Sequence, residues 1–252
     1  MSEPDVEALR ERVALACRIL GEMQLAKDAT GHASARLPGT NRIFIRARGP
    51  GEKGVRYTTA DQVVEVGLDG KLVRSNDQGL EAPIEVFIHT AVYKARPDVY
   101  AVTHMHPASI VLFTATKKKL LPIYGAWDPP SAKLAMQDIP VFPRSILVST
   151  PALGDELAST LGDSSCCMMR GHGITTAGPN IEEAALTGIH LNTLARMNYD
   201  ACLLGDPEPI PQEEQDIFLN MDEKRSGAPG EPPTGRVAAL WRYYAELTKA
   251  KG

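Results

Sequence analysis

The segment at residues 101–107 constrains the fold most, because it combines a strand pattern with two metal-ligand side chains. It reads Ala-Val-Thr-His-Met-His-Pro. If residues 100–105 form a β-strand, its side chains alternate between two faces, and His104 and His106 then lie on one face, roughly 6 to 7 Å apart. Imidazole is the commonest protein ligand for zinc and also suits iron and related ions. The segment is compatible with an ordinary strand face, but it also predicts two ligands of one metal ion.

A third ligand of the right type lies later in the chain. Catalytic zinc sites usually have three protein ligands and one open position. His172 stands between Gly171 and Gly173, and glycines let a backbone turn sharply and approach another segment closely. A carboxylate, Glu85, precedes the histidine pair. Together these residues favour the metal site over the ordinary strand.

Composition excludes several classes of protein. With 252 residues, of which 43% are hydrophobic and 23% charged, the chain fits one large globular domain. The net charge of -4 and the pI near 5.9 give no reason to expect nucleic acid as a partner. No run of about 18 apolar residues predicts a membrane span. The four cysteines form no Cys-x-x-Cys pair, so we expect free thiols in a reducing cytoplasm.

Apolar periodicity and turn residues predict the order of the elements. We expect helices at 5–24, 81–95, 108–115 and 152–161, a long one starting at Asn180 and a last one at 236–249. We expect strands at 33–37, 42–47, 62–66, 71–73, 120–124, 140–142 and 166–170, and a solvated turn at Lys117 to Lys119. Residues 1–205 then form the metal-binding domain. Residues 206–252 form proline-rich connectors and a helix that docks on the same or a neighbouring subunit.

Several motifs, in this order, resemble the class II aldolase/adducin family over most of the chain up to about Gly205. They are Gly31-His-Ala-Ser-Ala-Arg36, Glu85, Ala95-Arg-Pro-Asp98, His104-Met-His106 and Arg170-Gly-His-Gly173, with 19 residues from Glu85 to His104. The resemblance implies an α/β fold of three layers with a central, mainly antiparallel sheet flanked by helices. It implies one divalent ion per subunit (zinc, manganese or iron) on His104, His106 and His172, and Glu85 as the acid/base group. It also implies a homo-oligomer, with a tetramer favoured and active sites near subunit interfaces.

Departures from the sugar-phosphate aldolases of this family point to its other branch. Those aldolases have an asparagine after the first glycine and a Ser-Ser pair before the glutamate, which hold phosphate. Here the positions are His32, Pro83 and Ile84, and the last two side chains cannot donate hydrogen bonds to phosphate. The motif at 31–36, the apolar pair before Glu85 and the tail at 240–244 are more similar to the branch that decarboxylates hydroxylated aromatic acids.

We therefore predict a metal-dependent, non-oxidative decarboxylase of a dihydroxyphthalate or related ortho-hydroxy aromatic acid. Decarboxylation leaves an electron pair that must move onto a neighbouring oxygen, where a divalent ion stabilises it. We expect Glu85 to donate the proton, with its pKa raised by apolar neighbours such as Ile84. His32, Ser34 and Arg36 are candidates for orienting the substrate carboxylate. Tyr124, in the region where the family contributes a tyrosine across the subunit boundary, is a candidate for a second acid or a stacking ring.

Three other interpretations stay open at this point. The nearest is an aldolase that acts on an unphosphorylated hydroxy-keto acid. A non-haem iron oxygenase could use the same three imidazoles. A non-catalytic, adducin-like interaction module would need neither the histidines nor Glu85. His89 lies one turn from Glu85 on the predicted helix; it could join the metal site, but we favour a polar role at the surface.

Overall fold

The computed structural model describes residues 3–116, 118–221 and 229–249, and its centre is a seven-stranded sheet. The spatial order is β3-β2-β1-β4-β7-β6-β5, and every neighbouring pair is antiparallel except β5 and β6. The strands are β1 (His32–Arg36), β2 (Ile43–Arg46), β3 (Val63–Val66), β4 (Ala101–Met105), β5 (Val141–Phe142), β6 (Cys166–Met169) and β7 (Gly173–Gly178).

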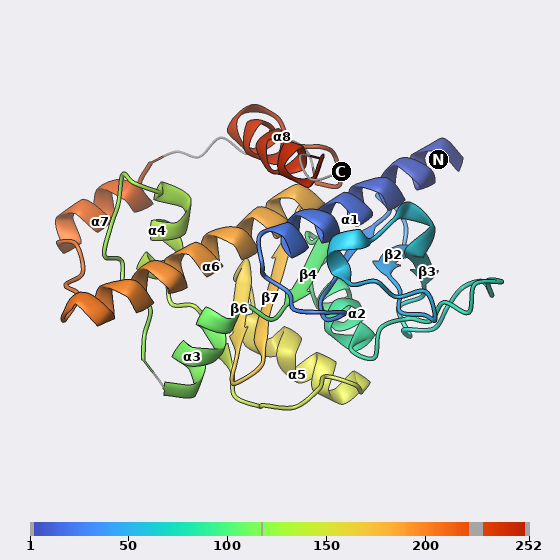
Figure 1. Ribbon diagram of the computed structural model, residues 1–252, viewed down its shortest axis with the longest axis horizontal. Helices are drawn as coiled ribbons and strands as arrows, with labels where there is room; N and C mark the ends of the chain where they lie inside the picture. Colours follow the sequence, from blue (N-terminus) through green and yellow to red (C-terminus); the bar gives the residue numbers. More distant parts are fainter. Residues whose placement is uncertain (1–2, 117, 222–228, 250–252) are drawn as a thin grey trace.

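Helices cover both faces of the sheet, which gives three layers (Figure 1). One face carries α1 (Glu3–Glu22) and α6 (Ile181–Leu204), with α8 (Gly235–Lys249) on their outer side, and the other carries α2 (Val86–Ala95) and α5 (Pro151–Leu161). At one end lie α3 (Ala108–Thr116), α4 (Pro129–Met136) and α7 (Gln212–Leu219). Two short 3-10 helices span Val55–Tyr57 and Ala60–Gln62. The predicted α/β fold with a mainly antiparallel sheet between helices is confirmed.

Strand β1 shows how the sequence divides the two faces of the sheet. All five of its side chains are buried, but they alternate in kind. Ala33 and Ala35 belong to the hydrophobic core on the side of α1 and α6, whereas His32, Ser34 and Arg36 contact residues of α2 or the chain just after it. The two-residue period of a strand therefore gathers the polar residues of this motif under one helix.

Helix α6 begins where its capping residues predict. The Asn180 side chain accepts a hydrogen bond of 2.8 Å from the backbone N–H of Glu183. This satisfies one of the backbone donors that a helix leaves free in its first turn. The prediction of a long helix after Asn180 is confirmed.

Helix α2 starts later than predicted, and this affects the site. The helix begins at Val86, and Glu85 is its N-cap residue. The backbone of Glu81 instead exchanges two hydrogen bonds with Arg48, 2.9 and 3.0 Å long, and so cannot enter the helix. Glu85 consequently lies where the chain turns into the helix, rather than on the helix surface.

Of the predicted strands, the one at residues 120–124 is wrong and the one at residues 71–73 is reduced to a single bridge. Residues 120–124 form no strand, because the backbone N–H and C=O of Leu121 bond to the Asn198 side chain of α6 at 2.8 and 3.0 Å. Residues 71–73 make a single bridge, Val66 to Leu72, beside β3. In the lysine run, Lys117 lies outside the described residues.

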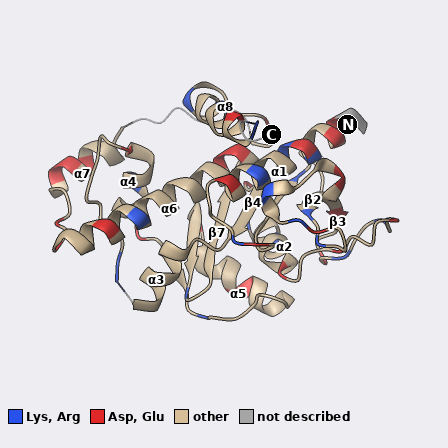
Figure 2. Ribbon diagram, in the orientation of Figure 1, with Lys and Arg blue, Asp and Glu red and all other residues tan. Residues whose placement is uncertain are grey.

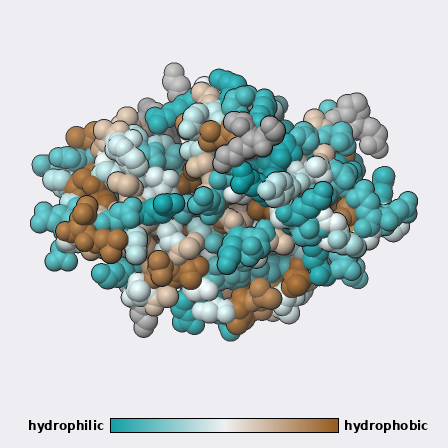
Figure 3. Space-filling model, viewed as in Figure 1, coloured by the Kyte–Doolittle hydropathy of each residue, from teal (hydrophilic) through white to brown (hydrophobic). Residues whose placement is uncertain are grey.

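The outer surface mixes charge and apolar groups. In Figure 2, acidic and basic residues are interspersed on α1 and α6, whereas α7 carries acidic residues. Hydrophobic residues gather at the left end in Figure 3, where Figure 1 places α7 and the end of α6. The exposed apolar side chains of these elements include Leu203, Leu204 and Ile217. Among the described segments, no helix combines the length and the apolarity that crossing a membrane requires.

Candidate active site

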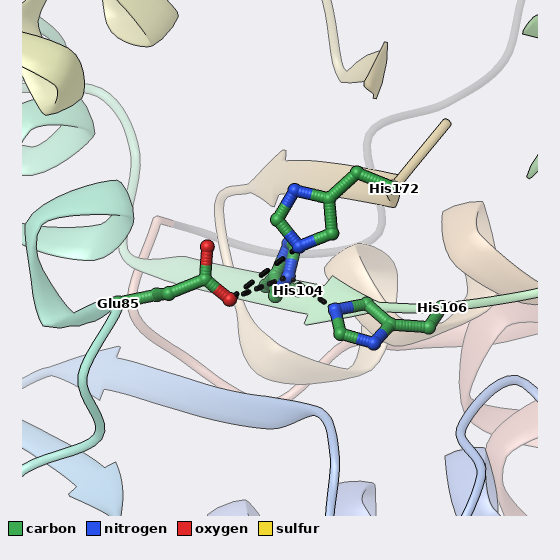
Figure 4. A group of neighbouring side chains, drawn as sticks. All are labelled: Glu85, His104, His106 and His172. Carbon is green, nitrogen blue, oxygen red and sulfur yellow. Dashed lines mark hydrogen bonds and ion pairs between the residues drawn. The ribbon is translucent and has the colours of Figure 1, made fainter. Parts of the chain in front are cut away.

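Four candidate ligands converge from three parts of the fold (Figure 4). His104 is on β4 and His106 follows its end, His172 lies in the turn between β6 and β7, and Glu85 precedes α2. One ligand atom of each residue lies within 4.8 Å of the others. The structure thus brings together the three predicted metal ligands and the predicted acid/base carboxylate.

The Nε2 atoms of the histidines face one carboxylate oxygen. Glu85 Oε2 lies 3.4 Å from His104 Nε2 and 3.5 Å from His172 Nε2, and the Nε2 atoms of His104 and His106 are 2.8 Å apart. The other oxygen, Oε1, accepts a hydrogen bond of 2.8 Å from the backbone N–H of Val148. This bond orients Glu85 and leaves Oε2 for the site.

The two glycines beside His172 have separate roles. Gly171 has φ of +60°, a conformation that side chains disfavour, and it allows the tight turn after β6. Gly173 lies so close to β4 that an added Cβ would be 2.2 Å from the Met105 carbonyl oxygen and 2.9 Å from His106 Cδ2. The predicted sharp turn and close backbone approach at His172 are both present.

The cluster fits a divalent metal ion. Within the described chain, His172 Nδ1 has no hydrogen-bond partner, and Nε2 reaches only Glu85 Oε2. A buried polar atom without a partner is costly, and a metal ion would remove that cost at Nε2. Three nitrogen donors and one oxygen donor suit zinc, manganese or iron.

Burial keeps the imidazoles of His104 and His106 in the form that binds metal. Desolvation, with neighbouring His104 and His172, lowers the pKa of His106 to about 3. Desolvation also lowers the pKa of His104, although Glu85 opposes the shift. Metal ligation needs a neutral imidazole, so these rings require no further deprotonation at neutral pH.

The predicted rise in the pKa of Glu85 is wrong. Burial does act to raise this pKa, but hydrogen-bonding and charge interactions with His104 and His172 outweigh it and lower the pKa overall. The side chain of Ile84 is 51% exposed and does not enclose the carboxylate. Glu85 is therefore ionised within the cluster.

His32 and Ser34 are connected to each other through His89. The His32 ring centroid lies 5.2 Å from that of His104, so His32 borders the cluster. Its Nδ1 is 2.7 Å from His89 Nε2, and His89 Nδ1 is 2.7 Å from Ser34 Oγ. The Ser34 hydroxyl also bonds to the Tyr93 hydroxyl at 2.8 Å.

Arg36 is directed to the backbone around the end of α2. Its guanidinium donates hydrogen bonds to the carbonyl oxygens of Tyr93, Arg96, Pro97 and Val99. It also stacks over the Tyr93 ring, 5.1 Å from the ring centroid. In this chain Arg36 joins β1 to the end of α2, and its contact with a substrate stays a prediction.

Tyr124 makes an aromatic contact with a neighbouring residue of its own segment. Its ring packs edge-on against Trp127 with a centroid distance of 5.1 Å, just before α4. The prediction that it acts across a subunit boundary concerns an assembly, and it stays a prediction.

His89 and Tyr93 are the residues that the sequence interpretation missed. His89 is completely buried, so the favoured surface role is wrong. The two residues are four apart and share one side of α2, a helix with buried apolar residues around most of its circumference. That nearly continuous apolar pattern was the signal that a histidine in this helix would be buried.

Comparison with known sequences places these residues in a family. The model of the Class II Aldolase and Adducin N-terminal domain matches residues 11–199. The chain is 38% identical over 198 residues to the 3,4-dihydroxyphthalate decarboxylase of Arthrobacter keyseri, covering 78% of this chain and 79% of the relative. It is 36% identical over 200 residues to the enzyme of the same name from Rhodococcus jostii strain RHA1, covering 79% and 82%.

Solved structures share the fold. The aldolase II superfamily protein from Pseudomonas syringae has a TM-score of 0.82 and 23% identity, covering 99% of this chain and 96% of that one. The L-fuculose 1-phosphate aldolase from Glaciozyma antarctica PI12 has a TM-score of 0.76 and 20% identity, covering 96% and 89%. Sequence and fold agree, and the chain belongs to the class II aldolase and adducin family.

Proposed function

We propose that the protein is a metal-dependent lyase that removes one carboxyl group, as carbon dioxide, from a hydroxylated aromatic acid of the 3,4-dihydroxyphthalate type. The convergence of three imidazoles and Glu85 carries this proposal. It is supported by relatives of 35 to 38% identity that are 3,4-dihydroxyphthalate decarboxylases. The predicted carboxy-lyase activity agrees with these relatives.

His104, His106 and His172 would hold one divalent ion per subunit, and zinc, manganese and iron all suit this donor set. Such an ion supplies a Lewis acid beside the oxygen that takes up electrons when the carbon–carbon bond breaks. Glu85, fixed through Oε1 by Val148, keeps Oε2 on the same side as the imidazoles. Its carboxylate is thus placed to transfer protons close to that oxygen.

Glu85 acts first as a base and then as an acid. As an ionised group it accepts the proton of the substrate hydroxyl next to the departing carboxylate. It then donates this proton to the ring carbon that bears the carboxylate, which gives a transient keto form. The bond to the carboxylate breaks, its electron pair restores the aromatic ring and moves the keto C=O pair onto oxygen, and carbon dioxide leaves. That oxygen then takes a proton from solvent, which restores the hydroxyl. In 3,4-dihydroxyphthalate the carboxylate next to a hydroxyl is at position 2, so the product is 3,4-dihydroxybenzoate.

The remaining predicted residues position the substrate. His32 borders the cluster and is the nearest of them to His104. Ser34 acts on His32 through His89, and Arg36 acts through its hydrogen bonds to the end of α2. Tyr124 would reach an active site of a neighbouring subunit.

We further propose a cytoplasmic homo-oligomer, with a tetramer favoured. The exposed apolar group at the end of α6 and on α7, formed by Leu203, Leu204 and Ile217, supports burial against another subunit. All four cysteines are free, as expected of a reducing compartment.

A direct assay tests the proposed reaction. Purified protein with 3,4-dihydroxyphthalate should release one carbon dioxide per 3,4-dihydroxybenzoate formed, and no aldehyde. His106→Ala should lose both bound metal and turnover, because two imidazoles no longer complete the site. His190→Ala is the matched control, because His190 is outside the cluster and its Nδ1 lies 3.3 Å from Asp128 Oδ2. This variant should keep both the bound metal and the turnover. Aldehyde release, or full turnover by a metal-free His106→Ala variant, would overturn the proposal.

A further inference from the structure

A buried chain of hydrogen bonds runs from the edge of the metal cluster into the layer between β1 and α2. It links His32 Nδ1 to His89 Nε2 at 2.7 Å, His89 Nδ1 to Ser34 Oγ at 2.7 Å, and Ser34 Oγ to the Tyr93 hydroxyl at 2.8 Å. The four side chains are between 0 and 6% exposed. Water therefore has little access to these groups, and the protons must be arranged among them.

Each inner group of this chain takes part in two hydrogen bonds, which makes the chain directional. A ring nitrogen that accepts a hydrogen bond carries no proton, and the Ser34 hydroxyl can donate to His89 or to Tyr93 but not to both. A neutral imidazole has one donor and one acceptor nitrogen, and a serine hydroxyl has one proton. All three hydrogen bonds must therefore run the same way, either toward His32 or away from it.

The Tyr93 end decides the direction. Ser34 Oγ is the acceptor within reach of the phenol among the described residues. If the chain ran away from His32, the buried Tyr93 proton would have no acceptor, and such groups are rare in folded proteins. The bonds consequently run from Tyr93 to Ser34, from Ser34 to His89 and from His89 to His32.

We propose that this chain fixes His32 as a neutral ring with its proton on Nε2, and that this N–H binds a carboxylate oxygen of the substrate. Because His89 Nε2–H donates to His32 Nδ1, the single proton of His32 is on the other nitrogen. In the described part of the protein, His32 Nε2 has no hydrogen-bond partner, and the ring borders His104. His89, Ser34 and Tyr93 are positioning residues that act through His32. The carboxylate as ligand rests on the proposed function, whereas the direction of the chain does not.

Nuclear magnetic resonance of the zinc-loaded, full-length protein with 15N-labelled histidine tests the direction. Two-bond 15N–1H correlations distinguish the two neutral tautomers, and His32→Gln assigns the His32 signals. We expect the Nε2–H tautomer for both His32 and His89 in the wild type. The Nδ1–H tautomer of His32 would overturn the proposal, whatever substrate the enzyme uses.

Variants test whether the chain serves substrate binding. Ser34→Ala removes the donor to His89 and should give mixed His32 tautomers, with KM for the carboxylated substrate raised about tenfold and kcat changed much less, because a hydrogen bond to a charged group is lost. Tyr93→Phe leaves Ser34 in place but removes the group that directs its proton, and should show a smaller change of the same kind. If Ser34→Ala does not fold, Tyr93→Phe alone tests whether the chain serves substrate binding.

The matched control is Ser109→Ala, which removes a hydrogen bond of 2.7 Å between α3 and Asn192 on α6, in which no residue of the hydrogen-bond chain takes part. It should leave the tautomers and KM unchanged. Wild-type tautomers and KM in both Ser34→Ala and Tyr93→Phe would contradict the positioning role. If the tautomers are as expected but no carbon dioxide is released from any hydroxylated aromatic acid, the proposed function fails and the tautomer assignment stands.

Discussion

Glu85 shows how a single residue connects the fold to the proposed chemistry. As the N-cap residue of α2, it is held by the Val148 N–H through one oxygen and faces His104 and His172 with the other. A carboxylate in this position could ligate the ion or move protons. The proposed mechanism requires the second role, and the three imidazoles supply the ligands.

Glu85→Gln separates these roles. The amide keeps the shape and a hydrogen-bond acceptor for Val148 but cannot transfer protons at neutral pH. We expect bound metal close to the wild-type level and a fall in kcat of about 10²- to 10⁴-fold, the usual contribution of general acid–base catalysis. Metal content and kcat measured on the same samples give the answer. Glu156→Gln, which alters an exposed pair with Arg144, is the control; a parallel loss of metal and turnover in Glu85→Gln would identify a ligand instead.

The cysteines give a second residue-scale prediction. Burial raises the pKa of Cys17 to about 11 and those of Cys166 and Cys167 to about 12. A raised pKa leaves almost no thiolate at pH 8, and the thiolate is the reactive form. Iodoacetamide at pH 8 should therefore modify the partly exposed Cys202 first, as read by mass spectrometry, and all four thiols in guanidinium. Rapid native modification of Cys166 or Cys167 would contradict the buried core.

At the scale of single residues, the sequence predicted the role of those residues whose neighbours in the sequence indicate it. The two-residue spacing of His104 and His106 and the glycines around His172 indicate ligands without knowledge of the fold. The pKa of Glu85 could not be predicted, because it depends on imidazoles that come from β4 and the β6–β7 turn. His89 was missed because only the packing of α2 on β1 shows that the ring is buried.

Among the elements, the β6–β7 hairpin depends on a glycine at position 173, where the fold leaves no room for a side chain. Gly173→Ala would place a Cβ against the backbone of Met105 and beside His106. We expect a loss of about 1–3 kcal/mol of stability, or roughly 3 to 10 °C in Tm, together with weaker zinc binding, since β7 must move away from β4. Thermal unfolding and zinc titration measure the two effects. Gly51→Ala, with open space around the glycine, should change neither, and an unchanged Gly173→Ala would show that β7 is not tightly packed there.

Elements with local signals were predictable, and elements that depend on distant partners were not. The capping hydrogen bond of α6 joins Asn180 to Glu183, three residues further on, and the helix starts as predicted. The segment around Leu121 has an apolar, strand-like pattern, but Asn198, 77 residues away, binds its backbone and prevents strand pairing. The start of α2 was misplaced for the same kind of reason, since Arg48 pairs with the backbone of Glu81.

At the scale of the whole molecule, α8 packs on α1 and α6 of its own chain and covers part of their outer surface. Val237, Leu240, Trp241 and Tyr244 face the core cluster there, and each is only partly buried. α8 contacts α1 and α6 of its own chain in this structure. The division at residue 205 and the docking of the last helix on the same or a neighbouring subunit stay predictions. The apolar end of α6 and α7 is the surface on which the proposed oligomer depends.

The central claim is that one divalent ion, held by His104, His106 and His172, is required for the loss of carbon dioxide. The most direct measurement is carbon dioxide release from 3,4-dihydroxyphthalate by chelator-stripped protein, to which zinc, manganese or iron is returned while bound metal is counted. We predict almost no release from stripped protein, and a rate that rises in proportion to bound metal until one ion is bound per subunit. Full release by protein without bound metal would contradict the account.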